Sequence, residues 1–183
     1  MILEPTFIRD LYVIEPKVFR DGRGFFYEFF NQAEFEKVTQ KKIRFIQDNL
    51  AQSKKGVLRG LHFQKPPYAQ AKLVSVLSGA VLDVVVDLRP ESKTFKQYFS
   101  VYLSAENKKQ LFIPRGFAHA YLSLEEDTLF CYKIDNIYHP DSEAGIRFDD
   151  PDLNIDWQYD LSQIMLSEKD KNLPYLKDIS DIL

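Results

Sequence analysis

The residues from 72 to 134 form a series of short apolar runs, and this pattern constrains the fold more than any other feature. Residues 80–88 show it best: Ala, Leu and Val at the even positions alternate with Val and Asp at the odd positions, which gives one fully apolar face. Turn residues such as Ser78-Gly79 separate the runs. The other runs are 73–77, 95–103, 109–113, 118–124 and 128–134. The pattern predicts a mainly β protein, a sandwich or barrel whose length fits a jelly roll.

The segments on either side complete the expected elements. We expect strands at 6–14, at 19–30 with a tight turn at 21–24, and at 44–50, and a hairpin that pairs 73–77 with 80–88. Asn31 is typical of a helix start, and a short helix is predicted over 33–41. From residue 138 we expect loop with one short strand, and then helical pieces over 162–183, broken at Pro174. No repeat or linker is visible, so a single domain over 1–183 is predicted.

Composition narrows the classes of partner. A formal net charge of -3 at pH 7 gives no general affinity for nucleic acid or for a membrane surface, so recognition of an anion has to be local. No basic leader and no long apolar run stands at the N-terminus. The single cysteine, Cys131, cannot form an internal disulfide and is expected to be a buried thiol in a reducing compartment. We therefore expect a soluble, cytoplasmic protein.

The stretch from 56 to 72, GVLRGLHFQKPPYAQAK, carries the strongest chemical signal. It places Arg59, His62 and Lys72 among apolar residues, which indicates a strand that lines a cavity rather than a solvated charge cluster. A histidine alone is more often a hydrogen-bonded core residue, but two nearby cations without carboxylates favour a site that binds an anion and moves a proton. Because Arg59 and His62 are three apart, a regular strand would separate them, and Gly60 is where a bulge would realign them.

A metal site is not expected. Barrels that bind a metal through histidines typically use a His-x-His pair with a nearby carboxylate, whereas this chain has His62-Phe63-Gln64 followed by Lys65 and two prolines.

Four further residues have ordinary explanations that the sequence leaves open. His119 reads as a surface or capped histidine, and Tyr132 as a core tyrosine. Asp170 follows Ser167 in a pattern that a helix start alone would explain, and Arg23 lies between glycines as a turn charge would.

Five segments together resemble a known family. They are DGRGFFYEFFN (21–31), QDNLAQSKKGVLRGLHFQKPPYAQAKLV (47–74), GAVLDVVVDLRPES (79–92), IPRGFAHAYLSL (113–124) and DDPDLNIDW (149–157). In this order they are similar to the dTDP-4-dehydrorhamnose 3,5-epimerases. The resemblance implies a cupin-like jelly roll, a homodimer, no metal and no organic cofactor. It also implies a dTDP-sugar substrate, dTDP-4-dehydro-6-deoxy-D-glucose, inverted at C3 and C5 to dTDP-4-dehydro-L-rhamnose.

The resemblance also implies a role for each matching residue. The general base falls on His62, its aspartate partner on Asp170, the proton donor on Tyr132 and the enolate-stabilising lysine on Lys72. Contacts to the nucleotide and phosphates fall on Arg23, Phe26, Glu28, Gln47, Asn49, Arg59, His119, Tyr138, Glu143 and Lys169. The segment from Arg23 to Glu28 is expected to reach the site of the other subunit.

Two positions depart from the family pattern. Ala120, followed by Tyr121, stands where the family usually has glycine, and Gln158 stands where it has proline. Three rivals stay open beside the 3,5-epimerase: a relative that epimerises only C3 or only C5, a sugar ketoisomerase of the cupin type, and a sugar-nucleotide binding module without catalysis. The RGLHFQ context disfavours the ketoisomerase.

Overall fold

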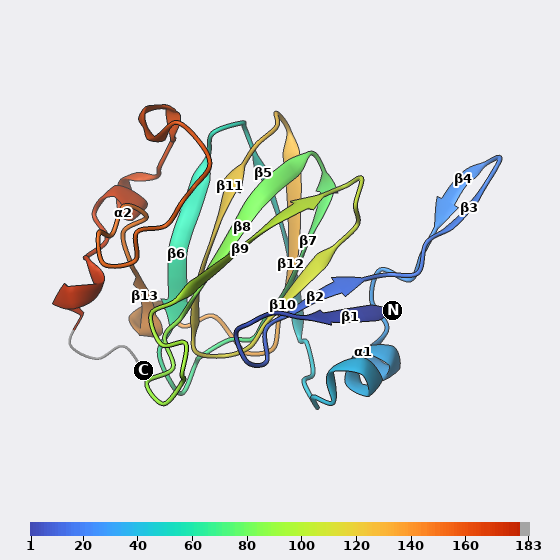
Figure 1. The fold of residues 1–183 in the computed structure, drawn as a ribbon, viewed down its shortest axis with the longest axis horizontal. Helices are drawn as coiled ribbons and strands as arrows, with labels where there is room; N and C mark the ends of the chain where they lie inside the picture. The colour runs from blue at the N-terminus through green and yellow to red at the C-terminus, as the bar shows by residue number, and fades with distance from the viewer. Residues whose placement is uncertain (180–183) are drawn as a thin grey trace.

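The computed structural model describes residues 1–179, in which two antiparallel sheets face each other around a common interior (Figure 1). The six-stranded sheet has the order β1–β2–β10–β7–β12–β5, with bounds Ile2–Pro5, Tyr12–Glu15, Gln110–Ile113, Lys72–Ser78, Thr128–Ile134 and Gln47–Ser53. The five-stranded sheet has the order β13–β6–β11–β8–β9, with bounds Glu143–Gly145, Leu58–Gln64, Phe117–Ser123, Ala80–Asp87 and Tyr98–Ser104. The prediction of a mainly β jelly roll is confirmed.

Strand β8 shows how the alternating sequence builds this fold. All eight of its residues are buried, because both of its faces are covered. Leu82, Val84 and Val86 pack into a cluster on the outer side of the five-stranded sheet, whereas Val81 and Val85 pack inside the barrel. The alternation therefore separates two apolar cores and sends the aspartates of this strand inward with the valines.

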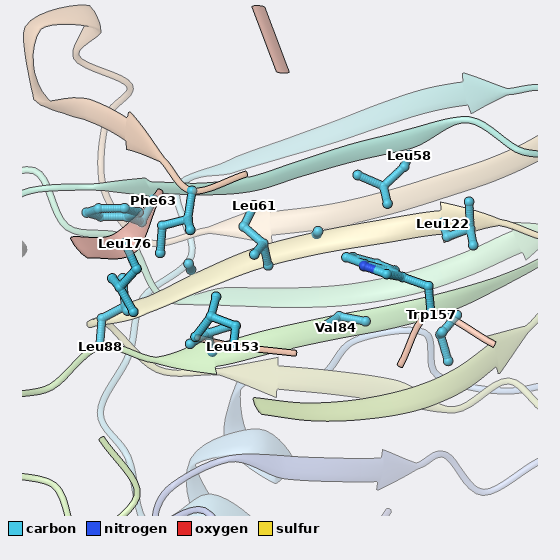
Figure 2. Close-up of a cluster of buried hydrophobic side chains, with 14 residues drawn as sticks. Leu58, Leu61, Phe63, Val84, Leu88, Leu122, Leu153, Trp157 and Leu176 are labelled. Atoms are coloured by element: carbon cyan, nitrogen blue, oxygen red, sulfur yellow. The ribbon is translucent and has the colours of Figure 1, made fainter. Parts of the chain in front are cut away.

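The C-terminal third covers the outer side of the five-stranded sheet. Figure 2 shows Trp157 near Leu58 of β6 and Leu122 of β11, and Leu176 at the other end of the same cluster near Phe63 of β6. The indole N–H of the tryptophan donates to the carbonyl of Phe148 at 2.9 Å, which satisfies its one polar atom. This C-terminal third contains the helix α2 (Glu168–Lys171) and the 3₁₀ helices η1 (Pro140–Ser142), η2 (Leu161–Gln163) and η3 (Leu176–Asp178), besides β13 at the edge of the sheet. The predicted helical pieces are confirmed up to residue 179, and 180–183 lie outside the described residues.

The N-terminal region carries the one longer helix and a separate hairpin. Helix α1 (Gln32–Thr39) begins at Asn31, whose side chain accepts from the backbone N–H of Glu34 at 3.1 Å, as the sequence predicts. Strands β3 (Phe19–Asp21) and β4 (Gly24–Phe26) form a two-stranded hairpin that projects away from the two sheets (Figure 1).

Several strand predictions are wrong. Residues 73–77 and 80–88 do not form a hairpin, because β7 and β8 belong to different sheets and the turn at Gly79, with φ of +75°, carries the chain from one to the other. Of the strand expected at 6–14, residues 6–11 instead form a turn between β1 and β2, closed by the N–H of Thr6 on the carbonyl of Leu11, and only 12–14 lie in a strand, β2. The strand expected at 19–30 ends at Phe26, and the strand expected at 44–50 is shifted to β5.

Two burial predictions also need correction. Cys131 is only half-buried, because it lies on the outward-facing side of β12 rather than in the interior. His119, expected at the surface or at a cap, is buried with 7% of its surface exposed, because the side chains at alternate positions of β11 point into the barrel.

Candidate active site

The barrel interior opens into a cavity of about 500 Å³, and a second pocket of about 280 Å³ adjoins it. His62, Lys72 and Tyr132 line both, so they form the wall between the two compartments. The larger cavity is also lined by Arg59, His119, Lys169 and Asp170, and the smaller one by Gln47, Asn49, Tyr138 and Glu143. Residues from six strands and from α2, far apart in the sequence, thus meet in one place.

A bulge in β6 brings Arg59 and His62 to the same side of the strand. His62 pairs with His119 of β11 and Arg59 pairs with Tyr121, so a three-residue step on one strand faces a two-residue step on the other. Gly60 lies in the bulge at φ of +114°, and a Cβ there would come within 2.5 Å of the carbonyl oxygen of His119. The bulge predicted at this glycine is confirmed, and no other residue fits there.

His62 and Asp170 form a hydrogen-bonded pair between β6 and α2. Nε2 of His62 lies 2.5 Å from Oδ1 of Asp170, whose carboxylate is almost fully buried. Burial alone would raise the pKa of Asp170, but the hydrogen bond and charge of His62 hold it below its usual value. Ser167 also caps α2 by accepting from the N–H of Asp170, so the helix start predicted by the sequence and the pair with the histidine are both present.

Lys72 and Tyr132 come from neighbouring strands of the six-stranded sheet. Burial lowers the pKa of Lys72 to about 8, against the opposing charges of Asp83 and Glu143. Burial raises the pKa of Tyr132, so this phenol keeps its proton at neutral pH. The site therefore holds an ammonium that is easily neutralised and a phenol that is a proton donor.

A second histidine–aspartate pair lies deeper in the barrel. Nε2 of His119 is 2.9 Å from Oδ2 of Asp83, and the aspartate is fully buried on β8. Burial lowers the pKa of His119, and the charge of Asp83 opposes that shift. Asp83 was not among the residues that the sequence singled out, although a carboxylate at an inward position of an apolar strand was a usable signal that a partner was needed.

Polar side chains from three segments meet at the rim of the smaller pocket. The hydroxyl of Tyr138 donates to Glu143 at 2.7 Å, and the ammonium of Lys169 lies 2.6 Å from the same carboxylate oxygen. Nearby on β5, the amide of Gln47 donates to Oδ1 of Asn49 at 2.8 Å. These groups present donors and acceptors to a ligand that enters from this side.

Three residues expected to bind ligand lie elsewhere. Arg23 and Phe26 are exposed on the β3–β4 hairpin, where Arg23 pairs with Asp21 at 2.6 Å. Glu28 follows the hairpin and accepts from the amide of Asn31 at 2.9 Å. None of the three lines either compartment of the cavity in this chain.

Among residues 1–179, no group of three His, Cys, Asp or Glu side chains is close enough to hold a metal ion. Over the same residues, no helix has the length and apolar character needed to cross a bilayer.

The inner wall of this cupin-like barrel thus carries a histidine–carboxylate pair, a lysine and a tyrosine, all side chains that can take up or donate a proton. A family model described as dTDP-4-dehydrorhamnose 3,5-epimerase matches residues 5–178. The dTDP-4-dehydrorhamnose 3,5-epimerase of Escherichia coli (strain K12) is 50% identical over 174 residues, which cover 95% of this chain and 94% of the relative. The chain belongs to the dTDP-4-dehydrorhamnose 3,5-epimerase family.

Two solved structures of epimerases are closely similar to this chain. The Legionella pneumophila enzyme RmlC, in complex with dTDP-4-keto-L-rhamnose, has a TM-score of 0.93 and 48% identity, covering 97% of this chain and 94% of that one. ChmJ from Streptomyces bikiniensis, a 3'-monoepimerase in complex with dTDP-quinovose, has a TM-score of 0.88 and 35% identity, covering 94% and 87%. Proteins with this fold therefore include a 3,5-epimerase and a 3'-monoepimerase.

Proposed function

We propose that this protein is an isomerase that inverts C3 and C5 of dTDP-4-dehydro-6-deoxy-D-glucose, giving dTDP-4-dehydro-L-rhamnose for dTDP-L-rhamnose biosynthesis. The observation that carries the proposal is that His62, Lys72 and Tyr132 line both compartments of one cavity. A base, an enolate-stabilising cation and an acid thus surround a space in which a sugar ring fits.

His62 is the proposed general base. The hydrogens at C3 and C5 both flank the C4 ketone, so the loss of either one gives an enolate with its charge on the C4 oxygen. His62 takes the proton from carbon and becomes an imidazolium, and Asp170 at 2.5 Å stabilises that charge and fixes the ring.

Lys72 and Tyr132 complete the proposed reaction. The ammonium of Lys72 stabilises the enolate oxygen as charge develops there. Tyr132 then donates its proton to carbon on the face opposite to His62, which inverts the centre; the tyrosinate regains a proton from solvent and the imidazolium of His62 releases its proton to solvent. The raised pKa of Tyr132 supports this role, because the phenol is protonated before the step. The same sequence at the second carbon completes the double epimerisation.

The nucleotide and diphosphate are assigned to the groups around the catalytic residues. The guanidinium of Arg59 suits a phosphate, because its planar array of donors pairs with two oxygens at once. Lys169 and His119 add donors in the same cavity, and Gln47 and Asn49 on β5 offer amides that match a pyrimidine edge. Tyr138 and Glu143 close the rim.

We also propose that two copies form a homodimer in which Arg23, Phe26 and Glu28 complete the partner's site. The support is that the hairpin projects from the barrel with Phe19, Phe25 and Phe26 all more than half exposed (Figure 1). Three exposed aromatic rings on one hairpin are typical of a protein–protein interface. Residues 1–183 would act as one epimerase domain, in the cytoplasm, without a metal or organic cofactor.

Deuterium exchange tests the reaction directly. The protein is incubated with dTDP-4-dehydro-6-deoxy-D-glucose in deuterated water, and the ring hydrogens are followed by NMR, with His62→Ala as the control. Incorporation at both C3 and C5, lost in His62→Ala, is the expected result. Incorporation at one carbon would identify a single-site epimerase, a rival that the likeness to ChmJ keeps open. Normal nucleotide binding without any incorporation would leave only the binding module.

A further inference from the structure

Tyr121 is a buried polar residue of the cavity wall to which the proposed mechanism gives no role. It lies on β11 with 4% of its surface exposed, and its ring stacks on Phe130 of β12 with centroids 4.0 Å apart. The stack places the phenol oxygen 3.1 Å from Oγ of Ser53 on β5. This hydrogen bond joins the two sheets across the barrel, since β11 and β5 belong to different sheets.

Ser53 in turn contacts Arg59. Nε of Arg59 donates to Oγ of Ser53 at 3.2 Å, and Nη2 donates to the carbonyl of Gln52 at 3.2 Å. Within residues 1–179, the third nitrogen, Nη1, makes no hydrogen bond of that geometry, and the guanidinium also lies near the phenol of Tyr121, where its charge opposes the rise that burial causes in the pKa of that tyrosine. The donors Nε and Nη2 are therefore fixed on β5, and the remaining N–H groups of the guanidinium are left for a ligand.

The geometry points to Tyr121 as the positioning residue of Arg59. We propose that its hydroxyl holds the hydroxyl of Ser53, which anchors Nε, so that the remaining N–H groups of the guanidinium face the cavity and bind the diphosphate of the sugar nucleotide. This inference rests on the proposed function for the identity of the ligand. A serine hydroxyl has three rotamers, and the hydrogen bond with the phenol favours the one that accepts from Nε of Arg59.

The alternative is that Tyr121 only fills space against Phe130. Tyr121→Phe separates the two explanations, because it keeps the ring and its stack and removes the hydroxyl alone. Loss of one neutral hydrogen bond predicts an affinity for thymidine diphosphate about three- to tenfold weaker, measured by calorimetry. With the sugar nucleotide, KM should rise by a similar factor while kcat stays within about twofold of the native value, as expected when a ground-state contact is lost.

A double-mutant cycle makes the coupling specific. In an Arg59→Ala background, Tyr121→Phe should cause no further loss of nucleotide affinity, because the residue on which it acts is gone. Tyr102→Phe, a half-exposed tyrosine on β9, is the matched control and should bind like the native protein. Additive losses in the cycle would overturn the proposal.

A measurement without ligand tests the positioning step by itself. The Nε–H signal of Arg59, assigned by its absence in Arg59→Lys, should exchange slowly with water in the native protein and faster in Tyr121→Phe. A protein that binds nucleotide but does not epimerise would refute the proposed function and leave this cycle interpretable. Native affinity and native Nε–H exchange in Tyr121→Phe would refute the role of Tyr121 whatever the activity, and a native protein that does not bind thymidine diphosphate would refute both.

Discussion

Two histidine–aspartate pairs in the described part of the barrel consist of the same residue types but differ in their surroundings. His62 is partly exposed, with 29% of its side chain accessible, and its partner Asp170 comes from a short helix that packs against the barrel. His119 has 8% of its side chain accessible, and its partner Asp83 lies on the neighbouring strand of the same sheet. The first pair is open to a ligand and to solvent, whereas His119 of the second lines the cavity with little of its side chain accessible. We therefore propose that the outer pair performs the chemistry and the inner pair supports the site.

Asp170→Asn should separate chemistry from stability at the outer pair. The amide cannot stabilise an imidazolium and favours the wrong tautomer of His62, so we expect kcat to fall by about 10² to 10⁴, as for other histidine–carboxylate pairs. The melting temperature should change little, because the helix cap and the burial of the side chain are retained. Steady-state kinetics and thermal unfolding measure the two effects.

Glu168→Gln is the matched control for that variant. It changes a carboxylate on the same short helix that faces solvent and pairs with Lys171. It should keep native kcat. A native rate in Asp170→Asn, or an equal loss in both variants, would contradict the assignment of the outer pair to the chemistry.

At the inner pair, Asp83→Ala should mainly reduce stability. Removal of the carboxylate leaves His119 buried without its partner, which we expect to reduce the free energy of unfolding by about 3 kcal/mol, as for other broken buried pairs. Urea unfolding measures this loss. A stability equal to that of the native protein would mean that the inner pair does not support the fold, and the contrast between the two pairs would then be lost.

The sequence predicted the outer pair better than the inner one for a physical reason. Ser167 and Asp170 form a local helix start that a spacing rule detects, and the resemblance to a family supplied the role of the carboxylate. Asp83 meets His119 only because β8 and β11 are neighbours, and strand order is a non-local property that alternation along one strand does not encode. The burial of His119 was missed for the same reason.

The errors in the fold have a similar origin. Alternation separated the two faces of β8 correctly, and the turn signal at Gly79 was real. What the local pattern could not show was that this turn joins two sheets instead of two paired strands, because the partners of β7 are β10 and β12, whose sequences lie far downstream. The bulge at Gly60 was predictable without any knowledge of strand order. Arg59 and His62 are three residues apart, so only an irregularity between them can bring both side chains to the same face of the strand.

The pH dependence of the reaction connects the inner pair to the outer one through Lys72. Burial lowers the pKa of this lysine to about 8, and the charge of Asp83 opposes the shift. Because the ammonium form is the one that stabilises the enolate, the rate should fall as pH rises through about 8. Asp83→Asn removes the opposing charge, so the alkaline limb of the pH–rate profile should move to lower pH. A limb that stays in place would show that another group controls it.

The smallest expected effect comes from the helix start that holds Asp170. Helix α2 has four residues, and Ser167 supplies the side chain that caps it by accepting from the N–H of Asp170 at 3.1 Å. Ser167→Ala removes a cap worth about 1 kcal/mol, so Asp170 should be less firmly held and kcat should fall by about fivefold. Ser167→Thr keeps a capping hydroxyl and should recover most of the rate. If both variants lose the rate equally, the loss comes from the change in the cavity wall that Ser167 also lines; if neither does, the packing of α2 against β6 alone holds the carboxylate.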